Sequence, residues 1–351
     1  NRPKHGGNLA WAAAIAGCPA SSILDFSASI NPLGIPQSAI AAIAQGIHQL
    51  TTYPDPEYSQ LKSVLAEHHH INPDFILTGN GSAELLTWGC RELAQQKVTH
   101  LVTPAFGDYQ RALAAFGAKI ASYPLPLASP SPHLPIPITF HPNKGLLLNN
   151  PHNPTGKLWV KNEILPYLKE FDSVVIDEAF MDFLPPSEDE SVIPLIADYP
   201  NLIIIRSITK FYSIPGLRIG YAIAHPERLQ RWQQWRDPWS VNTLAAVATE
   251  AAIKDIEFQQ QTWNWLPPVR THLLTELNKI SALHPIPGAA NFLLVKTDIS
   301  ATELQIQLLQ EYKILIRDCL SFPELGDRYF RVAVRLSEDN LKLINAIAAI
   351  V

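Results

Sequence analysis

The chain has 351 residues, of which 47% are apolar, and a formal net charge of −5 at neutral pH. This length supports a large buried core and favours two domains over one. The weakly acidic balance excludes nucleic acid as the main partner, because binding to a phosphate backbone requires a clustered basic face. No apolar run approaches the roughly 20 residues that a membrane span needs, so no membrane partner is predicted.

Near the N-terminus, Arg2 and Lys4 precede the apolar stretch Leu9–Ala16, a pattern similar to a secretion signal. The stretch has about eight apolar residues, which is at the lower limit for a signal peptide, so secretion is disfavoured. The three cysteines are far apart in the sequence and lack the spacing of a disulfide framework or a metal site. We therefore predict a cytoplasmic protein without a metal.

Between about residues 75 and 225, short apolar segments alternate with helical patterns such as Ala83–Gln96 and Lys161–Phe171. Uninterrupted Leu, Ile and Val runs favour strands covered on both faces, as in a mainly parallel sheet. This region is predicted to be an α/β domain with helices on both sides of the sheet. The predicted strands are Phe75–Thr78, Val98–Thr103, Gly145–Asn149, Ser173–Ile176, Leu202–Arg206 and Ile219–Ala224.

The Pro-rich stretch Pro124–Pro142 interrupts this region and is predicted to be an extended surface connection. After about residue 240, long helical patterns come first, and Pro267-Pro268 predicts a break or kink in them. A helix is predicted from about Glu338 to the end of the chain. Before it lie three predicted strands, Asn291–Lys296, Ile314–Arg317 and Tyr329–Arg335.

These patterns predict a large domain over residues 46–240. A smaller α+β domain is predicted from residues 1–45 together with residues 241–351.

A glycine-rich turn, Gly79-Asn80-Gly81-Ser82-Ala83-Glu84, follows the first predicted strand and opens a predicted helix. Glycines allow a tight turn, and the free amides at a helix N-terminus face an anion. Gly81, Ser82 and Ala83 are therefore candidates for holding a phosphate group. In isolation, an ordinary helix N-cap explains the turn about as well.

Two further polar segments follow buried strands. The loop Asn149–Gly156 contains two Asn-Pro turns that predict a rigid backbone, in which Asn153 can offer its amide to a ring oxygen. Asp177 ends the predicted strand Ser173–Ile176, and a buried carboxylate requires a cation such as a metal, an arginine or a protonated ring nitrogen. Taken singly, an Asx-turn and a structural ion pair are the alternative interpretations.

Lys210 follows the strand Leu202–Arg206, with Ser207 and Thr209 before it and Arg218 eight residues after it. A lysine forms Schiff bases when burial or neighbouring cations keep its amine neutral. Ser207 and Arg218 are suited to bind a phosphate dianion. A single lysine at such a position is more often a solvated surface residue.

Together the four segments provide a phosphate cradle, a donor to a ring oxygen, a carboxylate for a ring nitrogen and a Schiff-base lysine. These are the parts of a pyridoxal 5'-phosphate site. In an open parallel sheet the carboxyl ends of the strands meet at the edge where ligands bind. We therefore predict a pyridoxal-phosphate enzyme whose catalytic residues are Lys210 and Asp177.

With the motifs Asn-Pro-His-Asn-Pro-Thr-Gly and Ser-Ile-Thr-Lys, the chain resembles the fold-type I aminotransferase-like enzymes over nearly its whole length. The resemblance implies that Lys210 forms the Schiff base, Asp177 pairs with the pyridinium nitrogen and Asn153 donates to the phenolic oxygen. It implies that Phe106 stacks on the cofactor, although a plain core aromatic is the alternative. It also implies a homodimer in which Tyr53 reaches the neighbouring subunit's cofactor phosphate, although Tyr53 is otherwise an ordinary turn-flanking tyrosine.

Longer stretches resemble the threonine-phosphate decarboxylases, which convert O-phospho-L-threonine to (R)-1-amino-2-propanol O-2-phosphate in cobalamin biosynthesis. The related histidinol-phosphate aminotransferases commonly have glycine at the position of Arg335 and tyrosine at the position of Phe180. Phe180 cannot donate to the ring oxygen as that tyrosine would. The matching stretches are His5–Asn8, Asp25–Gly34, Thr209–Gly220, Trp239–Asn242 and Arg331–Arg335.

The resemblance also implies a set of substrate contacts, in which Ser29 departs from the family's usual asparagine. For each arginine taken singly, a surface ion pair is the alternative interpretation. A histidinol-phosphate aminotransferase is the alternative function, and a non-catalytic binding module is disfavoured by the presence of Lys210 and Asp177. The implied contacts are His5, Gly6, Ser29, Asn153, Arg317, Arg331 and Arg335.

Overall fold

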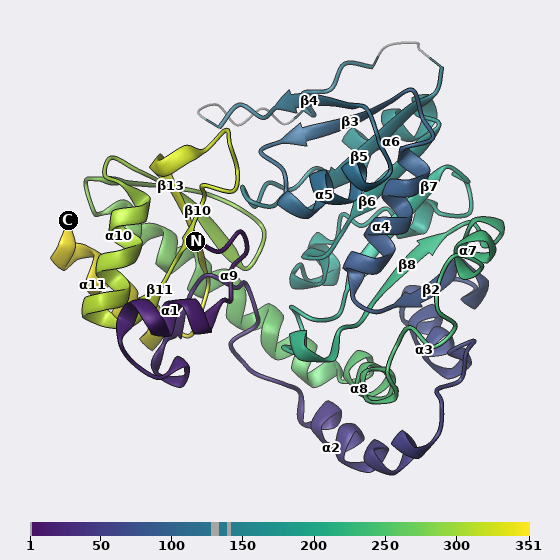
Figure 1. The fold of residues 1–351 in the computed structure, drawn as a ribbon, viewed down its shortest axis with the longest axis horizontal. Coiled ribbons are helices and arrows are strands. Elements are labelled where there is room, and N and C mark those ends of the chain that lie inside the picture. The colour runs from purple at the N-terminus through teal and green to yellow at the C-terminus, as the bar shows by residue number, and fades with distance from the viewer. Residues whose placement is uncertain (1, 128–132, 139–141) are drawn as a thin grey trace.

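The computed structural model describes residues 2–127, 133–138 and 142–351. Figure 1 shows a larger part built around a broad sheet and a smaller part in which both chain termini lie. The two parts are joined by the long helix α9 (Ile256–Asn278) and by the chain leading into α2 (Gln37–Gly46).

The larger part is built on a seven-stranded sheet of order β2-β8-β7-β6-β5-β3-β4. β8 runs antiparallel to both of its neighbours, and the other pairs are parallel. The mainly parallel α/β architecture predicted from the sequence is therefore confirmed. The strands are β2 (Ile76–Gly79), β3 (Val98–Thr103), β4 (Ile120–Pro124), β5 (Lys144–Asn149), β6 (Ser173–Asp177), β7 (Leu202–Ser207) and β8 (Gly220–Ala224).

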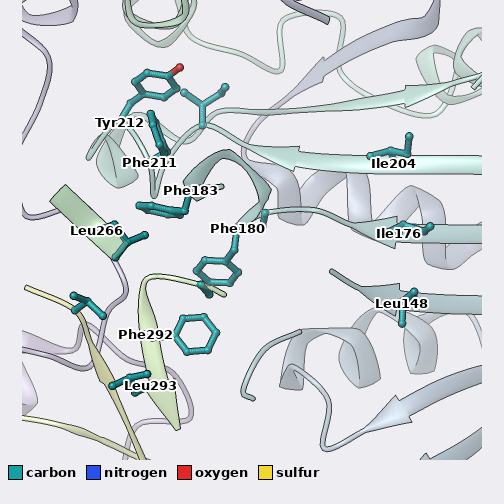
Figure 2. Packing of buried hydrophobic residues seen from close by; sticks show 14 of the residues in the cluster. Leu148, Ile176, Phe180, Phe183, Ile204, Phe211, Tyr212, Leu266, Phe292 and Leu293 are labelled. Carbon is teal, nitrogen blue, oxygen red and sulfur yellow. The ribbon is translucent and has the colours of Figure 1, made fainter. Parts of the chain in front are cut away.

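The central strands are apolar along their whole length because alternate side chains enter two different cores. Leu148, Ile176 and Ile204 lie in a row on three neighbouring strands in Figure 2, and this face continues through Phe180 and Phe211 toward Phe292 of the smaller part. The residues directly before these three in the same strands, Leu147, Val175 and Ile203, belong to the core on the opposite face of the sheet. The helices of this part are α4 (Ser82–Leu93), α5 (Gly107–Ala115), α6 (Lys161–Glu170) and α7 (Pro226–Gln233).

Strand β4 was not predicted, because at the sheet edge its side chains alternate between exposed and half-buried and it carries no continuous apolar run. It ends at Pro124, where the predicted Pro-rich connection begins. Much of that connection, at residues 128–132 and 139–141, lies outside the described residues.

Of the break or kink predicted at Pro267-Pro268, the break does not occur, because α9 runs through both prolines as a single helix of 23 residues. The kink stays a prediction. Leu266, Leu273 and Leu277 on this helix are fully buried, so tertiary packing outweighs the two missing backbone donors. Helix α8 (Thr243–Ile253) packs against α2 and α3 (Ser59–His69). The exact domain boundaries stay a prediction.

The smaller part contains an antiparallel sheet of order β12-β13-β10-β9 and a separate parallel pair of β1 with β11. The single strand predicted for Ile314–Arg317 is divided between these two sheets, with the change at Ile316. The strands are β1 (Leu24–Asp25), β9 (Leu283–Ile286), β10 (Phe292–Thr297), β11 (Ile314–Leu315), β12 (Arg317–Asp318) and β13 (Tyr329–Ala333). The helices are α1 (Leu9–Ala16), α10 (Ala301–Gln307) and α11 (Ser337–Ile350).

Within the described ranges, no helix combines the length and the apolarity that crossing a bilayer would take. The same residues contain no cluster of His, Cys, Asp and Glu suited to hold a metal ion.

Candidate active site

A cavity of about 390 Å³ lies where the carboxyl ends of β5, β6 and β7 meet the smaller part and the N-terminal segment. Its walls come from segments more than 300 residues apart in the sequence, as expected for a site at the edge of an open α/β sheet. Thirteen of the predicted site residues line it: His5, Gly6, Ser29, Ser82, Ala83, Phe106, Asn153, Asp177, Ser207, Lys210, Arg218, Arg317 and Arg331.

The predicted phosphate cradle is formed by the start of α4 and the arginine that follows β7. Gly81 has φ +78°, which favours glycine, and a Cβ there would displace the guanidinium of Arg218 from its place beside the turn. A Cβ at Gly220 would lie 2.5 Å from the backbone nitrogen of Ser82. Ser207 completes the cradle, with its hydroxyl 2.8 Å from that of Thr209. Helix amides, a hydroxyl and a guanidinium therefore converge, as a phosphate dianion requires.

Asp177 and Lys210 lie in the same cavity, at the ends of neighbouring strands. Both oxygens of Asp177 accept hydrogen bonds, one from the Tyr109 hydroxyl at 2.7 Å and one from the amide of Ala179 at 3.0 Å. Burial raises the pKa of Asp177, and the charge of Lys210 opposes that shift. Burial lowers the pKa of Lys210, while Asp177 opposes that shift and Arg331 adds to it. A buried amine whose neutral form is favoured is the state that Schiff-base chemistry requires.

Asn153 is fixed by contacts on two sides. Its backbone amide donates to the side chain of Asn149 at 2.6 Å, and Asn149 in turn donates to the carbonyl of Asp177 at 2.8 Å. The side-chain oxygen of Asn153 accepts a hydrogen bond from Arg331. This contact leaves the amide nitrogen of Asn153 as the group that can donate to a ring oxygen.

The two arginines of the smaller part occupy different environments. Arg331 is buried, with its guanidinium 4.7 Å from the ring centroid of Phe292, and burial lowers its pKa to about 10. Arg317 donates to the carbonyls of Pro3 and Lys4, and to the Ser321 hydroxyl at 2.6 Å.

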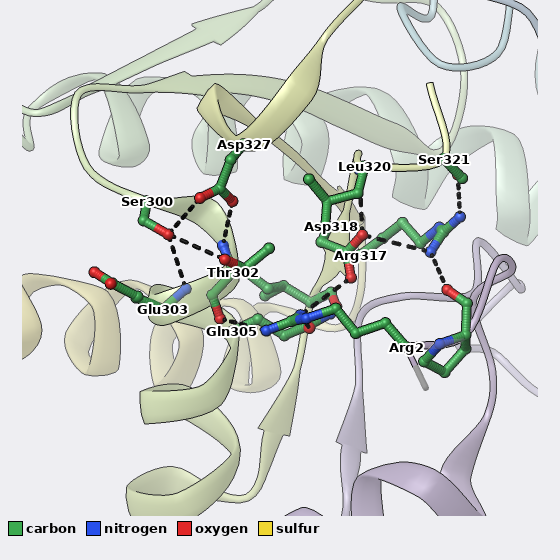
Figure 3. A network of polar contacts seen from close by, with 12 residues as sticks. Arg2, Ser300, Thr302, Glu303, Gln305, Arg317, Asp318, Leu320, Ser321 and Asp327 are labelled. Atoms are coloured by element: carbon green, nitrogen blue, oxygen red, sulfur yellow. Dashed lines mark hydrogen bonds and ion pairs between the residues drawn. The ribbon is translucent and has the colours of Figure 1, made fainter. Parts of the chain in front are cut away.

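Figure 3 shows that Arg317 and Arg2 together fasten the N-terminal segment to the smaller part. Arg2 donates to the side chain of Gln305 at 2.5 Å and lies 3.5 Å from Asp318. The segment held in this way carries Lys4, His5 and Gly6 into the cavity wall.

The ring of Phe106 lies in the cavity wall and packs edge-on against Tyr109 at 5.5 Å between centroids. Tyr53 lies elsewhere: it is 77% exposed and stacks on Trp239 at 4.4 Å. Arg335 is also outside the cavity lining, since it donates to Asp339 at 3.0 Å and to the carbonyl of Asp25 at 3.2 Å. Contacts of Tyr53 with a cofactor and of Arg335 with a substrate therefore stay predictions.

The residues present fit pyridoxal phosphate. The cradle is closed to side chains at Gly81 and Gly220, the aromatic ring of Phe106 borders the cavity, and a hydrogen-bonded carboxylate lies in the same cavity as a buried amine. The lysine would carry the cofactor and Asp177 would pair with its ring nitrogen.

The lining also includes residues that were not predicted from the sequence, among them Lys4, Tyr109 and Ser321. The spacing of Tyr109 from Phe106, three residues apart at the start of a helix, was a usable signal, because residues i and i+3 share a helix face. Ser321 had no such signal, since it lies in an irregular segment between β12 and β13.

Comparison with known proteins identifies the family. The family described as aminotransferase class I and II matches residues 21–347. The threonine-phosphate decarboxylase of Salmonella typhimurium is 37% identical, with 98% of this chain and 95% of that protein covered. Histidinol-phosphate aminotransferase 1 of Mannheimia succiniciproducens is 29% identical, over 94% of this chain and 90% of that protein.

Solved structures agree in fold. The histidinol-phosphate aminotransferase from Clostridium acetobutylicum has a TM-score of 0.82 at 28% identity, covering 93% of this chain and 99% of that one. The L-threonine-O-3-phosphate decarboxylase from Porphyromonas gingivalis has a TM-score of 0.83 at 24% identity, covering 93% and 98%. The chain therefore belongs to the aminotransferase class I and II family, with the fold-type I architecture and a pyridoxal-phosphate site.

Proposed function

We propose that this protein is a pyridoxal-phosphate-dependent lyase that decarboxylates O-phospho-L-threonine to (R)-1-amino-2-propanol O-2-phosphate in cobalamin biosynthesis. The observation that supports this proposal most is the excess of positive charge in the cavity lining. Among the described residues its lining contains Lys4, Lys210, Arg218, Arg317 and Arg331, against the two carboxylates of Asp108 and Asp177. Asp108 is itself paired with Arg111.

This cationic excess matches a ligand set with three anionic groups. Arg218 serves the cofactor phosphate, and Asp177 is assigned to the ring nitrogen. Arg317, Arg331 and Lys4 then remain for a substrate that carries both a phosphate and a carboxylate. The similarity to a threonine-phosphate decarboxylase at 37% identity over nearly the whole chain supports the same substrate.

Each residue around the reacting carbon then has a task. When bound, the cofactor supplies an electron sink for whichever bond of the substrate α-carbon stands perpendicular to its ring. Asp177, held by Tyr109, would hold a proton on the ring nitrogen of a bound cofactor. Arg317 and Arg331 orient the carboxylate, and this orientation selects loss of carbon dioxide over loss of a proton. We assign the amine of Lys210 as the donor of the proton returned to the α-carbon.

We further propose a homodimer in which Tyr53 contributes to the partner's site. The support is a group of exposed large apolar side chains on α2, in the residues that follow it and at Trp239, since exposed apolar surface of this kind marks interaction sites. The residues of this group and their exposed fractions are Ile40 43%, Ile47 52%, Leu50 54%, Tyr53 77% and Trp239 44%.

We also propose a cytoplasmic location. The support is that all three cysteines, Cys18, Cys90 and Cys319, are free thiols, as is usual in a reducing compartment.

The reaction is tested by incubating the purified holoenzyme separately with two substrates and measuring two products. With O-phospho-L-threonine we expect release of carbon dioxide that is independent of 2-oxoglutarate. With histidinol phosphate and 2-oxoglutarate we expect no comparable formation of glutamate. The reverse pattern would make the protein a histidinol-phosphate aminotransferase and overturn the proposal.

A further inference from the structure

We propose that Arg236 is a positioning residue for the cofactor phosphate, acting through Glu84 on the turn that forms the phosphate cradle. Neither residue lines the cavity, and the motif that follows Arg236, Trp239–Asn242, is not explained by the chemistry above. The proposal rests on the cofactor assignment and is independent of which reaction the enzyme performs.

The cradle turn is held by the side chain of Glu84. One carboxylate oxygen accepts the backbone amide of Asn80 at 2.7 Å, and the other accepts the indole N–H of Trp88 at 3.3 Å. A carboxylate that reaches back across the first turn of a helix fixes the backbone that enters it. The backbone fixed here is the Gly79–Ser82 turn, which leads into the cavity wall at Ser82 and Ala83.

Arg236 connects this carboxylate to the preceding strand. Its side chain is 4% exposed, and Nη1 lies 3.5 Å from the oxygen of Glu84 that Trp88 also contacts. The same nitrogen donates to the carbonyl of Thr78 in β2. One guanidinium therefore spans the end of the strand and the start of the helix, on either side of the turn.

The charge of Arg236 matters as much as its geometry. Glu84 places a negative charge beside a cradle that must accept a phosphate dianion. The carboxylate and the phosphate would repel each other and weaken phosphate binding. Arg236 offsets that charge without entering the cavity. Removing Arg236 would loosen the turn and would also leave the carboxylate of Glu84 uncompensated beside the phosphate.

The segment after Arg236 supports the opposite wall of the phosphate site. Asn242 donates to the carbonyl of Leu217 at 2.9 Å, directly before Arg218. The segment is itself anchored by Tyr58, whose hydroxyl bonds both the carbonyl and the amide of Val241 at 2.9 Å. Residues 236–242 therefore contact both sides of the cradle: Arg236 contacts the residues that flank the glycine-rich turn, and Asn242 contacts the residue before Arg218.

The test compares binding of pyridoxal phosphate with binding of pyridoxal, which lacks the phosphate, by titrating the apoprotein and following cofactor absorbance. For Arg236→Met we expect the Kd of pyridoxal phosphate to rise about tenfold, the effect of losing one charge-assisted contact. The Kd of pyridoxal should change by less than about twofold. Arg228→Met is the matched control: the Arg228 side chain is 12% exposed and pairs with Glu92, which lies on α4 as Glu84 does but at the end away from the cradle.

A second variant separates charge from folding. Adding Glu84→Gln to Arg236→Met should restore part of the affinity for pyridoxal phosphate, because the amide oxygen still accepts from Asn80 and the uncompensated charge is gone. If Arg236→Met does not fold, Arg236→Lys, which keeps the charge, should show the same selective loss to a smaller degree.

Equal loss of both ligands, or purely additive losses in the double variant, would overturn the proposal and leave Arg236 a general structural residue. An unmutated protein that binds pyridoxal no more weakly than pyridoxal phosphate would instead overturn the assignment of the cradle, and the proposal with it.

Discussion

Tyr109 shows how a single side chain outside the recognised motifs organises this site. Its hydroxyl holds one oxygen of Asp177, and its ring packs against Phe106. Because it donates to the ionised carboxylate, it lowers the pKa of Asp177 against the upward shift that burial causes. Tyr109 therefore supports both the ring-nitrogen partner and the aromatic ring in the cavity wall.

We predict that Tyr109→Phe raises the pKa of Asp177 and lowers kcat about tenfold, since one hydrogen bond to a charged group is lost. The measurement is kcat together with a pH titration of the cofactor's absorbance, which should shift in the variant. Tyr167→Phe is the control, because it removes a buried hydrogen bond to the carbonyl of Ile136, far from the site. An unshifted titration with unchanged kcat in Tyr109→Phe would contradict the assigned role.

Single residues differed in how far the sequence alone could place them. Lys210, Asp177 and Asn153 were predictable because each lies at the end of a buried strand or within four residues after it, and strand ends meet at one edge. Arg335 was assigned by resemblance alone. Its contacts are with Asp339, four residues away, and with the carbonyl of Asp25, 310 residues away, and no motif reveals either. The contact of Arg331 with Asn153 joins two parts of the fold and needs the tertiary structure.

At the scale of elements, the loop Asn149–Gly156 is rigid because its polar groups are satisfied internally. His152 is buried, with Nδ1 2.8 Å from the hydroxyl of Thr155 and its ring against Trp159. Burial lowers the pKa of His152 to about 3. The loop that presents Asn153 to the cavity is therefore held by a histidine that stays neutral.

This neutral histidine makes the loop sensitive to acid. Below the unfolded pKa of about 6.5 the unfolded chain takes up a proton that folded His152 does not. The contribution of His152 to the free energy of unfolding is therefore complete above pH 6.5. As the pH falls toward 3, that contribution is lost at up to about 1.4 kcal/mol per pH unit.

We predict that His152→Gln makes the fall in unfolding free energy between about pH 6 and pH 4 less steep, as measured by urea denaturation at several pH values. Gln260→Ala is the control, since Gln260 is exposed and carries no group that titrates in this range. A His152→Gln slope identical to that of the unmutated protein would show that His152 does not titrate as described.

The elements themselves were largely predictable where burial is two-sided. Continuous apolar runs predicted the central strands, whereas edge strand β4 and strand β9 lack such runs and were not predicted. At Pro267-Pro268 the local sequence predicted an interruption of the helix, but α9 continues through both prolines because its buried side chains pack against the rest of the fold. The low helix propensity of proline is a local effect, and the tertiary packing of the helix outweighs it here.

At the scale of the whole molecule, the cavity depends on parts that meet only in the folded chain. The N-terminal segment and the smaller part supply His5, Arg317 and Arg331, and the large sheet supplies Asp177 and Lys210. Tyr53 is 77% exposed and lies outside its own chain's cavity. The proposed dimer would bring it to a second site.

We predict that mixing Tyr53→Ala and Lys210→Ala chains restores activity that neither variant has alone. In a mixed dimer, the site of the Tyr53→Ala chain keeps its own Lys210 and receives Tyr53 from its partner. Activity is measured after denaturing and refolding the two variants together, with each refolded alone as the control. No recovery, with dimers present by sedimentation, would show that Tyr53 does not act across the interface.

The central claim is that Lys210 carries pyridoxal phosphate in the cavity that Asp177 lines. The direct measurement is borohydride reduction of the holoenzyme, followed by proteolysis and mass spectrometry to locate the pyridoxyl-phosphate adduct. We predict one adduct, on the peptide containing Lys210, and none in Lys210→Ala. An adduct on a different lysine, or an unmodified Lys210 in protein saturated with cofactor, would contradict the claim.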